Sequence, residues 1–429
     1  MSSAISAKRK IAVRVLVGIS LVLLALIYLS PTWWVALKAP NYPPEAFPDG
    51  VRIHFHMNGV FNGCTLQDNR EVEEDEALDC VHEMDAINHF VGMYPIASGG
   101  VLEKALSPFL LSMLAVMLVG FTIGPQYLRL GLMALGFAAI ASWMYMTYFG
   151  AGGVSYQPES YVSSLVTSLG QGKEEEGEAL SPIIAKLRQE LEANGSGNQK
   201  STEELRNTLS KGGQSSLSDA IANLHKGSGA GVRTLKEILE DAKGSGIQGK
   251  ELYISILKGA YEADQAKLPV AEREAWTGSI NQLVFWHYAK ALGRWFNNPE
   301  EINPMVSIMK TVGTWAVWAI MLAMLAMLVV AWNDRWPLFW LLGLIPALLP
   351  VFFIIEYAGW LWWYGHSMNA MGAFSLKPFM PTVFGQGKVA QFTTFSYPHY
   401  GFGLIVLFAV VTILAMLIRR KGLKELEAG

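Results

Sequence analysis

Cysteine and charge are what this chain has least of. Only two of its 429 residues are cysteine, and 16% are charged, against 52% that are hydrophobic. Two cysteines exclude a fold held by a disulfide framework, and they allow one bridge or one thiol metal site. So little charge is unusual for a soluble protein, yet the polar stretches between apolar runs exclude a chain buried wholly in lipid.

The signatures of several chemistries are also missing. The sequence holds no CxxC, CxxCH or HExxH motif, so c-type haem attachment and zinc-protease chemistry lack their usual residues. A net charge of −3, with no basic stripe among aromatics, gives no reason to expect nucleic acid as a partner. No nucleophile, base and orienting acid stand at motif spacing. We therefore expect a non-enzymatic protein.

Apolar runs predict an all-α polytopic membrane protein with six transmembrane helices in the lipid bilayer. Each run approaches the ~20 residues that cross a bilayer. The expected spans are Ile11–Leu29, Pro108–Ile123, Leu130–Phe149, Val306–Trp332, Pro337–Trp363 and Phe402–Ile418. Pro346 and Pro350 are expected to kink the fifth span. The aromatic stretch Pro31–Trp34 is expected to form an interface belt.

Basic residues set the expected orientation. Lysines and arginines at 8–10, 129, 335 and 419–421 fall on the side of both termini, which the positive-inside rule makes cytoplasmic. The result is a bacterial inner-membrane protein with a periplasmic head. Its expected parts are a signal-anchor helix (1–29), a first periplasmic segment (30–107), a transmembrane hairpin (108–149), a periplasmic helical insertion (150–305), a second hairpin (306–363), a third periplasmic segment (364–401) and a last helix with a basic tail (402–429).

The insertion consists of short helical patterns separated by glycine- and serine-rich breaks between Gly170 and Lys267. None is long enough to be stable alone, so the insertion is either a small helical domain used for interaction or a mobile spacer. From Glu272 to Asn298 tryptophans and leucines recur among polar residues. There we expect an amphipathic helix lying at the membrane interface.

The stretch from Arg52 to Met93 concentrates coordinating side chains. His54 and His56 are expected on one face of a strand, where imidazoles at i and i+2 can share a metal. A turn at Asn62–Gly63 and a helix from about Asp79 should follow, which makes the first loop a small α+β unit. Sulfur beside imidazole is the ligand set that copper prefers. The candidate copper ligands, which include the third segment, are His54, His56, His82, Met84, His89, Met93, His366, Met368 and Met371.

Plainer interpretations of these residues stay open. Cys64 and Cys80 enclose fifteen residues, a loop that a disulfide closes easily, although both thiols could instead bind the metal. Met93 could be a core residue. All eight histidines fall in the segments expected outside, but the short cytoplasmic turns leave little room for histidine.

Two stretches resemble a known family. They are CVHEMDAINHFVGMYPI, from Cys80 to Ile96, and GQGKVAQFTTFSYPHYGFG, from Gly385 to Gly403. Both resemble the polytopic membrane proteins encoded in bacterial nitrous oxide reductase gene clusters, the NosB-like group. The resemblance covers two loops with their flanking spans, and not the insertion. It implies an accessory or partner protein for the periplasmic copper enzyme that reduces nitrous oxide, and it assigns no residue a role.

Three functions follow from these observations. The first is an accessory protein that anchors the copper enzyme, or assists its copper loading or electron supply. The second is a quinol-linked electron-transfer subunit, suggested by Glu356 and the aromatic Trp360–Trp363, although the spans lack paired haem-binding histidines. The third, a transporter, is less favoured because inverted repeats and polar midplane residues are not evident.

Overall fold

The computed structural model describes residues 2–64, 79–94, 101–178, 249–296, 298–373, 378–389 and 391–427. These residues are mostly helical and include one antiparallel sheet. The chain divides into two compact units. Residues 1–153 and 279–429 form the membrane unit, and residues 154–278 form the insertion unit, which interrupts it in sequence.

The membrane unit contains the expected apolar helices. Five are each long and apolar enough to cross a membrane: α1 (Ser2–Leu29), α3 (Val101–Thr122), α4 (Gln126–Tyr148), α12 (Pro299–Val330) and α15 (Tyr400–Glu427). The sixth is a bent combination of η3 (Pro337–Trp340), α13 (Leu341–Ala347) and α14 (Leu349–His366). Its 58° bend falls between Pro346 and Pro350, because neither proline has the backbone N–H that would continue the helix. The predicted kink is confirmed.

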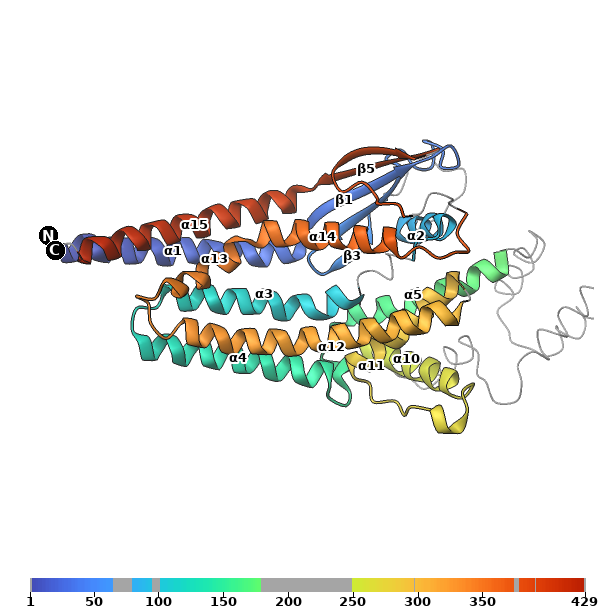
Figure 1. Ribbon diagram of the computed structural model, residues 1–429, viewed down its shortest axis with the longest axis horizontal. Helices are drawn as coiled ribbons and strands as arrows, with labels where there is room; N and C mark the ends of the chain where they lie inside the picture. Colours follow the sequence, from blue (N-terminus) through green and yellow to red (C-terminus); the bar gives the residue numbers. More distant parts are fainter. Residues whose placement is uncertain are drawn as a thin grey trace, which may run out of the picture. The chain divides into compact units, whose positions relative to one another are not determined.

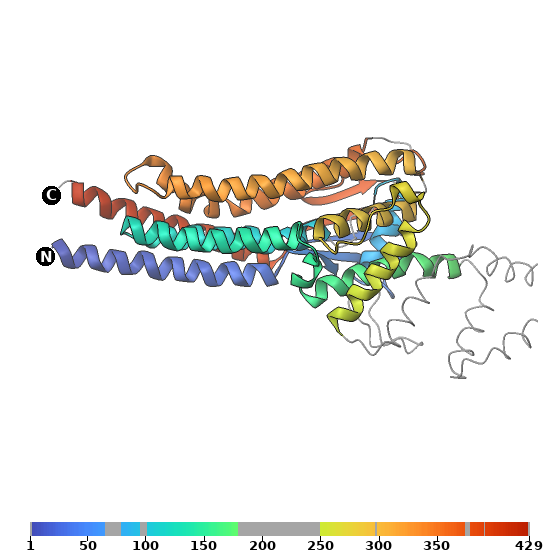
Figure 2. The ribbon, with the colours of Figure 1, turned by 90° about the horizontal axis from the view of Figure 1, so that it is seen from below.

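Helices α1 and α15 pack side by side although they come from opposite ends of the sequence (Figure 1). A buried hydrogen bond of 3.1 Å joins the hydroxyls of Ser20 and Thr412. Both chain termini lie at one end of these helices and the sheet lies at the other (Figures 1 and 2). We call these the terminal end and the sheet end of the membrane unit.

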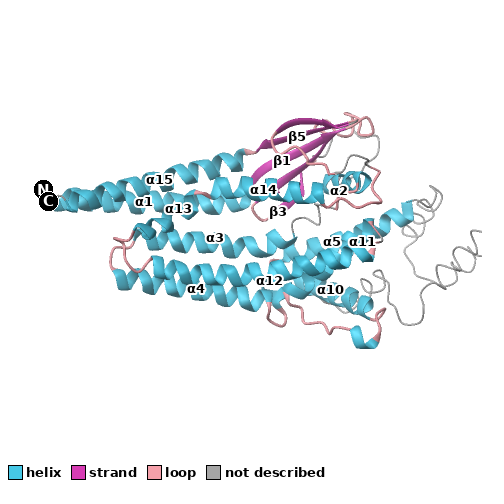
Figure 3. Ribbon diagram, viewed as in Figure 1, coloured by secondary structure: helices cyan, strands magenta, loops and turns pink. Residues whose placement is uncertain are grey.

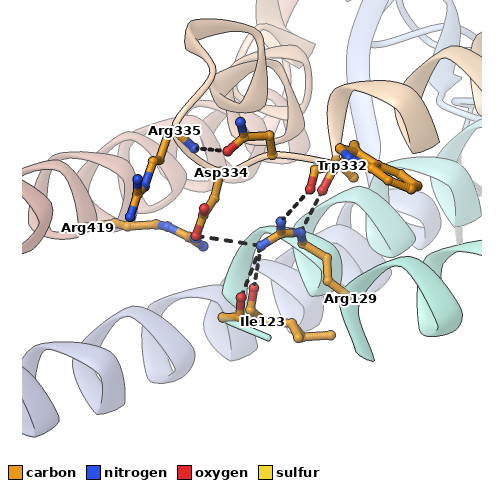
Figure 4. A network of polar contacts seen from close by, with 9 residues as sticks. Ile123, Arg129, Trp332, Asp334, Arg335 and Arg419 are labelled. Carbon is orange, nitrogen blue, oxygen red and sulfur yellow. Dashed lines mark hydrogen bonds and ion pairs between the residues drawn. The ribbon is translucent and has the colours of Figure 1, made fainter. Parts of the chain in front are cut away.

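At the terminal end, Arg129 joins two inter-helix turns (Figure 4). Its side chain is 1% exposed. It donates at 2.8–3.3 Å to four carbonyls just beyond α3 and α12, those of Ile123, Gly124, Ala331 and Trp332. The guanidinium thus supplies donors to carbonyls that helix ends leave without an internal partner. Asp334 lies 3.7 Å from both Arg129 and Arg419, which ties α15 to the same cluster.

Strands from both ends of the chain form a five-stranded antiparallel sheet in the order β3-β2-β1-β5-β4 (Figure 3). They are β1 (Pro31–Lys38), β2 (Val51–His56), β3 (Gly59–Asn62), β4 (Gly385–Val389) and β5 (Phe392–Pro398). Strand β1 follows α1, and its partner β5 precedes α15. The central strand pair therefore extends the α1–α15 helix pair beyond the apolar spans.

The sheet corrects two expectations, the position of a turn and the interface belt. Strand β2 ends at His56, and the turn that follows holds Met57 and Asn58 and not Asn62–Gly63, because His56 pairs with Gly59. Strand β1 occupies the stretch expected as an interface belt, and Trp33 within it is 2% exposed in the core. The description as all-α therefore applies to the spans and not to the sheet end.

One serine hydroxyl connects this sheet with α14. Ser396 in β5 is fully buried, and its Oγ donates to the carbonyl of Val383 at 2.8 Å. The indole N–H of Trp33 donates to the same Oγ at 2.9 Å, and the hydroxyl of Tyr357 lies 3.0 Å away. Since the serine proton is committed to Val383, Tyr357 is the donor in that contact. Ser396 therefore joins β1, β5, α14 and the segment before β4.

Helix α2 (Cys80–Val91) begins where the sequence predicts. The side chain of Asp79 accepts hydrogen bonds from two backbone N–H groups of its first turn. Cys80 forms a disulfide with Cys64, which confirms the structural interpretation of this pair. Met84 is 5% exposed in an apolar cluster with β2. The first segment is thus a small α+β unit, as expected.

Helix α11 (Ile280–Trp295) lies within the membrane unit. Leu283, Val284 and His287 are fully buried, and the helix contacts α3, α4 and α12. This differs from the amphipathic surface helix expected here. The aromatic and aliphatic spacing of this segment serves helix packing on several sides.

The insertion unit is described near its two ends. Helices α5 (Glu159–Glu178) and α10 (Lys250–Gln265) pack together, with Ile256 buried beside Val166. Helix α10 confirms one of the predicted helical pieces, and the others, between 181 and 243, lie outside the described residues. The backbone N–H of Val154 donates to the carbonyl of Gly278 at 2.8 Å, so the two ends of this unit are adjacent.

We expect Ser396→Ala to lower the free energy of unfolding by about 3 kcal/mol, because the buried donors of Trp33 and Tyr357 would lose their acceptor. Thermal unfolding in detergent, followed by circular dichroism, measures the loss. Ser307→Ala, at an exposed site on α12, is the matched control. Tyr357→Phe should cost less in the Ser396→Ala background than alone. Equal unfolding temperatures for Ser396→Ala and Ser307→Ala would contradict this role.

Candidate functional site

The two faces of the sheet have different surroundings. Ile53 and Phe55 of β2 belong to apolar clusters with α2 and α14, and Ile53 is 1% exposed. His54 and His56 alternate with them and lie on the opposite face, as the sequence predicts. That opposite face carries half-buried rings and one guanidinium. We call the following five residues the aromatic face: Trp34, Arg52, His54, Tyr397 and His399.

Contacts between strands hold the aromatic face together. The rings of Trp34 and Tyr397 lie 5.4 Å apart, directly opposite each other on β1 and β5. The guanidinium of Arg52 lies 4.6 Å from the centre of the Trp34 ring, a cation–π geometry. The rings of His54 and His399 are 5.1 Å apart. Side chains from β2, β1 and the end of β5 therefore form one continuous surface.

Burial keeps the imidazoles of this region uncharged at neutral pH. The pKa of His56 is lowered to about 4, mainly by burial and then by the charges of His54 and His399, with Lys104 adding to the effect. The pKa of His54 and that of His399 are also lowered, first by burial and also by the nearby charge of Arg52. At pH 7 the face therefore carries the charge of Arg52 among neutral rings.

The predicted ligands on and after α2 are spread over separate sites. Met84 lies in the cluster between α2 and β2, whereas Met93 is 2% exposed in a second cluster with Phe296. His89 packs its ring 4.9 Å from Phe296. His82 lies in the first turn of α2 and is not part of the aromatic face. Both methionines are buried in apolar clusters, which for Met93 is the plainer of its two interpretations.

The predicted ligands of the third segment are equally dispersed. His366 is exposed at the end of α14 with its ring stacked on Trp362, and Met371 is 67% exposed. Met368 packs in the same apolar cluster as Met93, so the third segment does fold against the first. Among the residues that the structure describes, no three His, Cys, Asp or Glu side chains are placed to hold one metal ion. The copper site stays a prediction.

Asn369 joins the first and third segments. Its backbone N–H donates to the carbonyl of Gly92 at 2.7 Å. Its side-chain amide donates to the carboxylate of Glu301 at 2.7 Å and to the hydroxyl of Tyr94 at 3.2 Å. Gly92 has φ +95°, and a Cβ there would lie 2.9 Å from the Asn369 carbonyl oxygen, so only glycine suits this position. These contacts join the two segments in one folded region at the sheet end.

A small open cleft lies between the buried face of the sheet and α14. The α14 residues that line it recur every three or four positions, so they lie along one side of the helix. This α14 wall consists of Phe353, Glu356, Tyr357, Trp360, Leu361 and Tyr364. The end of β2, the turn after it and Tyr288 of α11 form the opposite wall. Glu356 is exposed, so the cleft is open on the side of its carboxyl group.

The sequence prediction omits His399 from the ligands and assigns Trp34 to a lipid interface. Local signals for strands are present there, since β1 and β5 are rich in aromatic and β-branched residues. No local pattern shows that the two strands pair, because Trp33 and Ser396 are 363 positions apart. The pairing is what brings His399 to His54.

Comparisons with protein families, curated proteins and solved structures find no match for this chain.

Acidification should destabilise the sheet end. An unfolded histidine binds a proton near pH 6.5, whereas folded His56 does so only near pH 4. Between these values the unfolded state holds more protons, so stability falls as the pH falls. We expect the unfolding temperature to drop by a few degrees between about pH 7 and about pH 4.5. This drop in unfolding temperature should be smaller in the His56→Gln variant than in the wild type. In the His366→Gln variant it should equal that of the wild type. Parallel curves for all three proteins would contradict the burial of His56.

Proposed function

We propose that this chain is a non-enzymatic membrane protein whose sheet end docks a soluble oxidoreductase in the periplasm of a bacterium. The partner that the resemblance implies is the copper enzyme nitrous oxide reductase, which the chain would anchor or supply. The aromatic face carries the proposal. It is the one described surface of the sheet end where tryptophan, tyrosine and arginine side chains lie together and half-buried.

The chemistry of this face suits protein docking. Tryptophan, tyrosine and arginine supply most of the binding energy in many protein interfaces. Here strand pairing fixes the backbones of Trp34 and Tyr397, and the contact between their rings restricts the side chains, so little side-chain freedom is lost on binding. The neutral state of His54 and His399 at pH 7 lowers the cost of removing water from them. One rigid, weakly charged surface results.

The arrangement of the head supports the same proposal. The two stretches that resemble the NosB-like group meet there, since the ring of Phe90 in α2 lies 6.5 Å from that of Phe392 in β5. Both termini lie at the opposite end of the membrane unit (Figure 1). With the basic residues of that end on the cytoplasmic side, the aromatic face would lie in the periplasm.

Docking is tested by purification from native membranes in mild detergent, followed by identification and titration of the bound oxidoreductase. We expect the double variant Trp34→Ala/Tyr397→Ala to bind the partner about 30-fold more weakly, the loss typical of two interface anchors. The matched control is Tyr127→Ala/Trp332→Ala, which removes the same residue types from exposed sites at the terminal end. Equal weakening by both variants, or a wild-type protein isolated without any oxidoreductase, would contradict the proposal.

Copper loading is a second candidate, favoured by the contact of His54 with His399 beside His56. If the face loads copper, the purified protein should take one equivalent of Cu(I) from a chromogenic chelator. That equivalent should disappear in His54→Gln/His399→Gln and persist in His366→Gln/Met371→Leu, which alters the predicted ligands of the third segment. Absence of stoichiometric copper in the wild type would remove loading and leave docking alone.

A further inference from the structure

We propose that the cleft beside α14 binds the ring of an isoprenoid quinol that enters from the membrane. The cleft lies on the face of the sheet opposite to the aromatic face. The proposal therefore goes beyond docking and does not require the oxidoreductase. Four features of the cleft carry it: its level along the apolar helices, its charge, the arrangement of its rings and its length.

The cleft begins where the flanking spans end. Phe402, near the start of α15, and Trp33, just after α1, both pack on Phe353 with ring centres 6.1 Å apart. Helix α14 continues for thirteen residues beyond Phe353, about 20 Å at 1.5 Å per residue, alongside the sheet. Glu356 and the rings that follow Phe353 therefore lie at and beyond the level at which α1 ends and α15 begins. A lipid-soluble molecule can reach this level from the bilayer.

The charge of the cleft selects against anionic lipids. Glu356 is the only acidic side chain among its described lining residues, and none of those residues is lysine or arginine. His56 contributes the strand end, while its ring packs 4.6 Å from that of Phe61 on β3. A phosphate or fatty-acid carboxylate would face Glu356 with no cation to pair with. A neutral ligand with a hydroxyl group can instead donate a hydrogen bond to the Glu356 carboxylate.

The rings of α14 form a ladder of parallel pairs. Phe353 and Tyr357 are inclined by 7° to each other, and Trp360 and Tyr364 by 26°. A cage for a quaternary ammonium group needs several ring faces that converge on one point. Roughly parallel rings in series suit a flat aromatic ligand, which stacks on them or meets them edge to face. The ladder thus favours a planar ring over a cationic headgroup.

The length of the wall fits a ring with the start of its tail. Phe353 and Tyr364 are eleven residues apart, which is about 16 Å along the helix. A quinol headgroup beside Glu356 would leave its isoprenoid chain on apolar surface towards the bilayer. The proposal concerns binding, and it assigns no electron transfer to the cleft.

The test is calorimetric titration of the purified wild-type chain with decylubiquinol and, separately, with its oxidised form decylubiquinone. We expect saturable binding of both. Glu356→Gln should weaken the quinol about 10-fold, because the quinol loses a charge-assisted hydrogen bond, and should leave the quinone unchanged. Trp360→Leu should weaken both forms about 10-fold, since both lose ring stacking.

Two variants on exposed sites serve as matched controls. Glu300→Gln at the start of α12 and Trp362→Leu on α14 remove the same groups outside the cleft and should bind like the wild type. Unfolding temperatures show that each variant is folded. The proposal is overturned by lack of saturable binding, by equal affinities for Trp360→Leu and Trp362→Leu, or by tighter binding of short-chain phosphatidylcholine than of the quinol. If quinol and quinone bind as expected but the oxidoreductase does not dock, the proposed function is contradicted and the quinol site is not.

Discussion

The buried hydroxyl of Ser396 is the contact on which the sheet end depends. It takes hydrogen bonds from Trp33 and Tyr357 and gives one to Val383, so a single oxygen coordinates two strands, a span and a loop. The surrounding rings exclude water, which means that no other acceptor is available to these donors. The aromatic face lies on one side of this contact and the cleft on the other. The register between β1 and β5 therefore determines the geometry of both sites.

Much of the membrane unit could be predicted from local patterns. Length and hydrophobicity revealed the spans, and the prolines at 346 and 350 revealed the bend, because these features need only neighbouring residues. The disulfide and the start of α2 are local in the same sense. The strand pairing of β1 with β5 is not, since its partners come from opposite ends of the chain. Aromatic residues next to an apolar span also have two physical uses, in the lipid interface or in a protein core, and Trp33 has the second.

Only the part of the candidate site that depends on the two-residue period of a β-strand could be predicted from the sequence. His54 and His56 share a face because alternate residues in a strand must, and the structure confirms this. The helical spacings through Met84 and Met93 fit a ligand set and a packed core equally well, and burial assigns both to the core. The α14 wall of the cleft follows a helical period, which the aromatic residues near 360 reveal in part. Its second wall comes from β2 and α11, and no spacing within α14 points to either.

The hydrogen bond between Val154 and Gly278 holds the first and last residues of the insertion unit next to each other. Because these two residues are neighbours, the insertion unit itself closes the loop between residues 153 and 279, and the membrane unit bears little of the entropy cost of that closure. Shortening the insertion between these two residues should therefore leave the pairing of β1 with β5 unchanged.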